Sequence, residues 1–417
     1  MNRTTVRSLL LAGLGLFATS RLQAADLFQI DAVTFTTTYS ASDKSVVDLV
    51  QNLITGTGHF APLANTTFVA NLNYAGVANA IRFNVTGGPG AWQARLTSPY
   101  TGLNQVFNGA TRDQLNSRIQ DFIKKDGSNE WNKFLRAMAE RSTVSSTDGN
   151  PGSATALIAD QAFDQFASPM AETREEKESD QDSSGRFGFG ITADAGMIRS
   201  GNFKGTSLSL PLYLPVKLTD RVGMVINLPI NYTEIEGSQI YNVGFGLALP
   251  IKVIKATKEN PWAWQLTPSG GGVGSASIDM ASGGILAQGT LSSALSHDFG
   301  SFTLSMGNQF TMVEGVPVTI SGYKFDPQVS QQIVKNGLKL AVPFGRRWVG
   351  SLYAVRTDFL ARAAIGDYYT IGGEIGYRFL GKPGGKKKRG YVKLGLYSDI
   401  AENYTSPHIQ FGSGWKF

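Results

Sequence analysis

The sequence contains no cysteine, and this absence removes several kinds of chemistry at once. Disulfide bonds and thiolate catalysis are excluded outright. The sequence also shows no phosphate-binding loop, no nucleotide fingerprint and no metal-ligand cluster. We therefore expect no cofactor, no bound metal and no nucleic-acid partner.

Long apolar runs are scarce as well, and the clearest one lies at the amino terminus. Arg3 and Arg7 precede the apolar stretch Leu9–Phe17, and small residues lead to Ala24 and Ala25. This order predicts a secretory signal peptide over residues 1–24, because a membrane-anchoring helix needs about 20 apolar residues. No later segment has a long uninterrupted apolar run, so a membrane form of this chain is expected to be a barrel.

Charge divides the rest of the chain into two parts. Residues 25–185 carry 12 basic and 18 acidic side chains, whereas residues 186–417 carry 23 basic and 14 acidic ones. The stretch 168–185 between them is dense in carboxylates and nearly free of apolar side chains. We interpret 25–167 as a soluble domain, 168–185 as an acidic linker and 186–417 as a second domain. A charged, exposed helix is the alternative for the linker.

The last strand carries the clearest pattern of the second domain. Its apolar side chains alternate with glycine and polar residues: Ile409, Phe411, Trp415 and Phe417 against His408, Gln410, Gly412, Gly414 and Lys416. Strand side chains alternate with period 2, and a lipid-facing barrel strand is apolar on one side only. Trp415 and Phe417 are therefore predicted to form an outer-membrane carboxy-terminal signature, with membrane lipid and the barrel-assembly machinery as partners.

Similar alternation recurs along the second domain and predicts an all-β transmembrane barrel of about 12 antiparallel strands. The predicted strands cover residues 187–192, 207–218, 222–232, 243–253, 262–267, 285–295, 302–312, 337–344, 348–359, 369–379, 391–400 and 409–417. Val316–Phe325 could add a strand or extend a loop, and we favour the loop.

Orientation follows from the connections, because outer-membrane barrels have short periplasmic turns and longer outer loops. With the carboxy terminus in the periplasm, five turns are predicted there: 219–221, 255–261, 297–301, 345–347 and 380–389. The longest connection, 313–336, is predicted to lie outside. The basic turn at 381–389 is interpreted as a solvated charge run, with anionic headgroups or the acidic linker as alternative partners.

Charged residues that alternate with apolar ones are predicted to face the lumen. They are Arg186, Asp194, Lys217, Lys252, Arg356, Asp358, Glu374, Arg378, Lys393 and Lys416. So many ionic groups require a hydrated interior or ion pairs, such as Glu374 with a neighbouring arginine. A basic excess favours small anionic solutes if the lumen conducts. Neutralisation of interior carboxylates, without conduction, remains an equal alternative.

The first domain is predicted to be a small α+β unit. Phe28–Tyr39 and Thr66–Arg82 are rich in strand-forming residues, whereas Ser45–Ile54 has apolar residues at helical spacing. Two helical segments follow, one beginning at Thr111 and one containing the stripe around Trp131. A helical hairpin is therefore expected after a small sheet.

Two resemblances can be stated. Phe107–Arg112, together with the helices and Asp148–Ser153 that follow, resembles a segment of uncharacterised exported proteins and implies no activity. The carboxy-terminal barrel resembles twelve-stranded autotransporter translocators, and this resemblance implies an amino-terminal passenger joined to the barrel by a linker. The passenger would be unusually short, and its helix-rich half departs from the long glycine-rich repeats common in such passengers.

The resulting hypothesis is a channel or translocation pore, with the first domain as a plug or periplasmic module, and not an enzyme. The alternative is an autotransporter-like protein that displays this domain at the cell surface. A second alternative is a hydrolase at the outer rim, for which His408 could act with Asp399 and Glu402. His297 adjoins Ser296 and Asp298, but neighbours in a strand point to opposite faces, and His59 shows no partner in the sequence. No catalytic residue is therefore assigned.

Overall fold

The computed structural model describes residues 26–123, 128–167, 187–257, 259–320, 323–345, 347–379 and 389–416. The predicted signal peptide, the acidic linker, Arg186, most of the basic turn and Phe417 lie outside these residues. Within the described ranges, no helix is both long and apolar enough to cross a membrane.

The amino-terminal part is a six-stranded antiparallel sheet in the order β2-β1-β3-β4-β5-β6, with helices packed on one face. The strands are β1 (Phe28–Val33), β2 (Thr38–Asp43), β3 (Phe68–Tyr74), β4 (Val77–Gly88), β5 (Ala91–Thr97) and β6 (Asn104–Gly109). The helices are α2 (Val46–Thr55), the short η2 (Gly58–Leu63), α3 (Arg112–Asp121) and α4 (Ser128–Ala139).

Local capping explains where two of these helices begin. The Ser45 side chain accepts the backbone N–H of Asp48 at 3.2 Å, and the Thr111 side chain accepts that of Gln114 at 3.2 Å. Each hydroxyl satisfies a backbone donor that the first helical turn leaves without a partner. Gly56 ends α2 in the left-handed conformation, with φ at +69°.

One cation lies in the core of this domain. Arg112 is 7% exposed, and its guanidinium lies 4.2 Å from the centre of the Trp92 ring. Nη2 donates to the carbonyl oxygens of Leu63 at 2.6 Å and Thr66 at 3.2 Å. Burial lowers the pKa of Arg112 to about 10, so the side chain stays charged at neutral pH and ties the start of α3 to the end of η2.

The carboxy-terminal part is a closed antiparallel barrel of twelve spans, which confirms the predicted strand number. Nine spans are single strands: β7 (Gly188–Ser200), β14 (Trp262–Ser277), β15 (Ser282–Asp298), β16 (Thr303–Val316), β19 (Ser330–Phe344), β20 (Trp348–Phe359), β21 (Asp367–Phe379), β22 (Arg389–Ala401) and β23 (Tyr404–Lys416). The barrel closes because β23 pairs with β7, from Lys416 opposite Gly188 to Tyr404 opposite Ser200.

The other three spans are each broken into two strands at a proline. They are β8 (Phe203–Ser209) with β9 (Leu212–Lys217), β10 (Gly223–Leu228) with β11 (Ile230–Ile235), and β12 (Ser238–Ala248) with β13 (Ile251–Ile254). The interruptions fall at Pro211, Pro229 and Pro250. Proline has no backbone N–H to donate, so it interrupts the hydrogen-bond ladder at each of these points.

A short hairpin of β17 (Val318–Ile320) and β18 (Tyr323–Phe325) lies in the connection between β16 and β19. It forms its own two-stranded sheet and adds no span to the barrel. The interpretation of this region as part of a long loop is therefore confirmed, although β19 begins at Ser330, earlier than the predicted residue 337.

The outer wall of the barrel is apolar. Side chains 43–65% exposed on this wall include Leu208, Leu291, Leu304, Leu338, Leu352, Ile371, Leu394, Leu396 and Phe411. Aromatic residues gather at the mouth where β7 begins and β23 ends: Trp262, Phe299, Phe344, Trp348, Phe379 and Trp415. The Trp415 ring stacks on Phe379 with centroids 5.7 Å apart. An apolar band bordered by aromatic rings is the surface that a bilayer requires.

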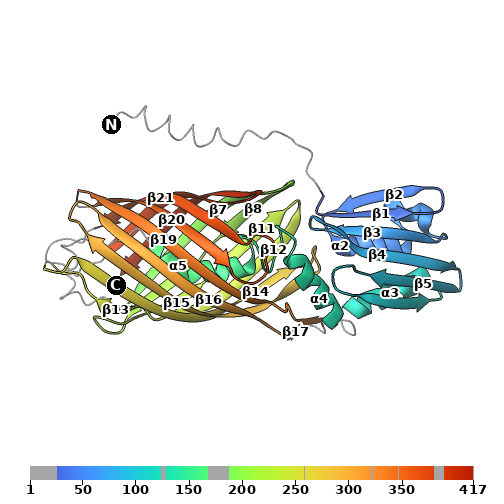
Figure 1. Cartoon of the computed structure of the whole chain (residues 1–417), viewed down its shortest axis with the longest axis horizontal. Coiled ribbons are helices and arrows are strands. Elements are labelled where there is room, and N and C mark those ends of the chain that lie inside the picture. The colour runs from blue at the N-terminus through green and yellow to red at the C-terminus, as the bar shows by residue number, and fades with distance from the viewer. Residues whose placement is uncertain are drawn as a thin grey trace, which may run out of the picture.

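The amino-terminal domain sits on the other mouth, as Figure 1 shows. Val46 N–H donates to the Asp279 carbonyl at 2.8 Å, and the Tyr74 hydroxyl donates to the Met280 carbonyl at 2.6 Å. Three hairpins at this mouth have turns of two residues, at 201–202, 236–237 and 402–403. The sequence predicted longer loops at the mouth opposite the carboxy terminus. The structure has these short turns there, and the amino-terminal domain covers the opening.

Candidate functional site

A helix occupies the barrel lumen. α5 (Ala154–Ala167) contacts β12, β14, β15, β16 and β19 from inside, as Figure 1 shows. Ala154, Ala156, Ile158 and Ala159 are completely buried against lumen side chains such as Ile333 and Phe359. Small alanine side chains let the helix backbone approach the wall closely.

The sequence-based boundary at residue 167 placed this helix in the soluble domain, whereas the structure places it in the barrel.

Two polar contacts fix α5 to the wall. The Gln309 side-chain amide donates to the Ala159 carbonyl at 2.7 Å. Lys335, whose side chain is 2% exposed, forms an ion pair with Asp160 of the helix. The Lys335 ammonium also lies 5.8 Å from the ring centres of Phe163 and Tyr368. A buried ammonium is costly without its anion, so Asp160 is a necessary partner.

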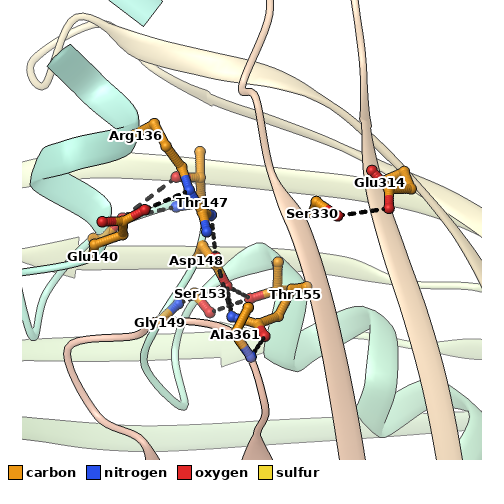
Figure 2. Close-up of polar contacts among 12 residues, drawn as sticks. Arg136, Glu140, Thr147, Asp148, Gly149, Ser153, Thr155, Glu314, Ser330 and Ala361 are labelled. Carbon is orange, nitrogen blue, oxygen red and sulfur yellow. Dashed lines mark hydrogen bonds and ion pairs between the residues drawn. The ribbon is translucent and has the colours of Figure 1, made fainter. Parts of the chain in front are cut away.

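The segment between α4 and α5 is held by Asp148, as Figure 2 shows. Its carboxylate accepts Arg136 Nη1 at 2.5 Å and the Thr155 hydroxyl at 2.8 Å, and Gln331 of β19 approaches it at 3.4 Å. Asp148 is 1% exposed. One buried carboxylate therefore joins the amino-terminal domain, the start of α5 and the barrel wall.

A cavity of about 590 Å³ lies in the lumen against α5. Its lining includes Tyr213, Pro215 and Pro229 of the proline-interrupted spans. The ionisable acidic and basic side chains that line it are Asp194, Lys335, Glu374, Arg378, Lys393, Asp399 and His408. The cavity thus presents both apolar and charged groups to any solute that enters it.

His408 is the centre of a compact polar cluster in this cavity. Nδ1 lies 2.7 Å from Asp194 Oδ1, Nε2 lies 2.8 Å from Ser406 Oγ, and Nε2 is 3.7 Å from Asp399 Oδ2. Thr370 donates to Asp399 at 2.5 Å. The structure therefore brings His408 to Asp399, as the sequence suggested, and adds Asp194 from the first strand.

A second charged group lies in the part of the lumen nearer the carboxy terminus. Lys393 of β22 pairs with Glu374 of β21 at 3.4 Å, and Arg378 of β21 and Lys339 of β19 are also buried. The predicted ion pair of Glu374 is thus seen with a lysine. Three cations and one carboxylate make this region basic.

The predicted lumen charges separate into four sets, of which one, Arg356 with Asp358, faces outward. Asp194, Glu374, Arg378 and Lys393 line the cavity. Lys217 and Lys252 lie on the strands at the carboxy-terminal mouth, where Lys217 bonds to Asp220 at 2.8 Å and lowers the pKa of that carboxyl. Arg186 and the side chain of Lys416 lie outside the described part of the chain.

Arg356 and Asp358 face outward, contrary to the prediction. On β20 the buried positions are Tyr353, Val355 and Thr357, whereas Arg356 is exposed beside Leu352. Arg356 pairs with Asp358 at 2.7 Å on this outer face. The assignment was wrong because α5 fills this part of the lumen, so apolar side chains such as Val355 face inward.

Sequence reasoning missed Lys335, Lys339, Asp160 and Ser406. The lysines had a usable signal, because they follow the alternation of Gln331 and Ile333 along β19.

Among the other histidines, His297 packs 4.5 Å from the Trp262 ring at the aromatic mouth, and His59 contacts the Phe60 ring at 6.0 Å.

Comparison with known proteins finds likeness at the level of fold. No family model matches the sequence, and no curated protein matches it. The translocator domain of autotransporter NalP from Neisseria meningitidis is 12% identical, with a TM-score of 0.40 over 63% of this chain and 98% of that one. An outer-membrane channel from Pseudomonas putida F1 is 14% identical, with a TM-score of 0.41 over 56% and 96%. Both TM-scores lie below 0.5, and the closed barrel is established by the strand pairing of the chain itself.

Proposed function

We propose that this protein is an outer-membrane barrel that displays its amino-terminal domain at the cell surface and keeps α5 in the lumen as a plug. The carrying observation is the path of the chain. The domain covers one mouth, α5 lies inside the barrel, and β7 begins at the opposite mouth. The described chain thus enters the lumen at α5 from the mouth that the domain covers, and β7 begins at the opposite mouth.

The side of the membrane follows from barrel topology. With an even number of strands, both ends of the barrel lie at one mouth, and in outer-membrane barrels that mouth faces the periplasm. The domain at the other mouth is then outside the cell. This reasoning favours surface display over a periplasmic module, and it makes the lumen the route by which the domain reached the surface.

The absence of cysteine allows a direct test of this placement. Thr36→Cys puts a thiol on the exposed turn between β1 and β2, and Ser301→Cys puts one on the exposed turn between β15 and β16 at the other mouth. Intact cells are treated with a membrane-impermeant maleimide. We expect Thr36→Cys to be labelled in intact cells and Ser301→Cys only after the outer membrane is permeabilised. The reverse pattern would place the domain in the periplasm and end the display proposal.

A pore for small anionic solutes is the second candidate function. The lumen residues Lys339, Arg378 and Lys393 are three cations beside one carboxylate, Glu374, which pairs with Lys393. An excess of lumen cations favours anions. Because α5 occupies the passage, conduction requires this helix to leave the lumen.

A further inference from the structure

Three lumen side chains form a hydrogen-bonded series that takes no part in holding α5. Ser406 Oγ lies 2.8 Å from His408 Nε2, and His408 Nδ1 lies 2.7 Å from Asp194 Oδ1. All three line the cavity. We propose that they form an acyl-transfer site, in which Ser406 is the nucleophile and small carboxylic esters are the substrates.

The order of the contacts fixes the roles. In the proposed site Nδ1 carries the ring proton and donates it to the Asp194 side-chain oxygen 2.7 Å away. Nε2 then has a free lone pair and accepts the Ser406 hydroxyl proton. A serine whose proton is held by a carboxylate-oriented imidazole is the arrangement of an activated nucleophile.

The imidazole is held in place on both sides. The Tyr397 ring stacks on it with centroids 4.4 Å apart and planes 4° from parallel. On the neighbouring strand it covers Gly196, where an added Cβ would lie 2.4 Å from the ring. Closure of the barrel brings these parts together, because β7 supplies Asp194 and Gly196, and β23 supplies Ser406 and His408.

The cavity indicates the size and character of the substrate. Ser406 is 1% exposed and lies in the wall of a cavity of about 590 Å³. A long acyl chain would exceed this space, whereas a short one fits beside Ile198, the lining residue of β7 that lies level with Ser406. The charged side chains that share this lining suit a polar leaving alcohol.

The reaction is an ordinary ester hydrolysis. Ser406 Oγ adds to the ester carbonyl carbon while His408 Nε2 takes its proton, and the C–O bond to the alcohol breaks as that proton moves to the leaving oxygen. Water then adds to the acyl-serine with His408 again as the base, releasing the acid and restoring Ser406. Asp399, 3.7 Å from Nε2, stabilises the imidazolium formed in between.

The test uses the purified full-length protein folded in detergent. A fluorophosphonate probe, followed by peptide mass spectrometry, reports the nucleophile, and p-nitrophenyl butyrate reports turnover. We expect phosphonylation at Ser406 in the unaltered protein. Ser406→Ala and His408→Asn are expected to reduce hydrolysis by at least ~100-fold, the size of a general-base contribution.

Ser305→Ala is the matched control, because Ser305 is a serine of barrel strand β16 that neither lines the cavity nor belongs to the series. This variant is expected to keep both the labelling of Ser406 and the hydrolysis of the ester. Heat-dependent gel mobility verifies that each variant forms a folded barrel. The proposal fails if the folded, unaltered protein is not labelled at Ser406, or if Ser406→Ala hydrolyses the ester at the original rate. Neither result depends on the side of the membrane occupied by the amino-terminal domain.

Discussion

At the scale of single residues, Gly196 decides whether the His408 ring can lie flat on the barrel wall. A methyl group at this position would meet His408 Cε1 and Nδ1 at 2.4 Å, too close for any packed contact. Gly196→Ala must therefore move the ring and lose the bond to Asp194. Overpacking of this kind costs about 1–3 kcal/mol. We expect the urea midpoint of barrel unfolding to fall accordingly.

Gly289→Ala provides the comparison, since a Cβ there meets no atom within 4 Å. Its expected effect on the free energy of unfolding is about zero or a small gain, because alanine restricts the unfolded chain more than glycine does. Equal losses of stability in the two variants would show that space around the ring is not what requires glycine at residue 196.

Individual residues also show what alternation alone can and cannot predict. It divided β20 correctly into two faces but assigned Arg356 and Asp358 to the lumen. Both faces of this strand carry apolar residues, since one lies on the exposed outer wall and α5 packs near the other. Which face is inside depends on the contents of the lumen, and that is a property of the assembled barrel.

At the scale of elements, α5 depends on one ion pair whose two halves are unequal. The Lys335 side chain is 2% exposed, whereas the Asp160 side chain is 42% exposed. Asp160→Ala leaves a buried, uncompensated ammonium and is expected to weaken helix docking by about 3 kcal/mol. Lys335→Met leaves a carboxylate that the cavity can hydrate, and it is expected to cost about 1 kcal/mol or less. Planar-bilayer recording should therefore show more frequent open events for Asp160→Ala.

The opposite ranking of these two variants would mean that packing of the lysine stem, not its charge, holds the helix.

The sequence of 154–167 is compatible with a helix, but its place in the lumen follows from contacts with β16 and β19, which begin about 150 residues later. The strands and most turns were predictable because their pattern is local. The joining of Asp194 to His408 was not, because it requires the first and last strands to pair.

At the scale of the whole molecule, the charge of the lumen predicts the behaviour of the barrel once α5 is gone. Lys339, Arg378 and Lys393 outnumber Glu374 in the part of the lumen near the carboxy terminus. A mature chain without residues 26–167 is therefore expected to conduct more than the full chain and to prefer chloride over potassium, measured as the reversal potential in a salt gradient. Lys393→Gln in the shortened chain should reduce this preference, whereas Lys204→Gln, at the amino-terminal-domain end of β8, should leave it unchanged. A cation-selective shortened barrel would contradict the anionic-solute proposal while leaving surface display intact.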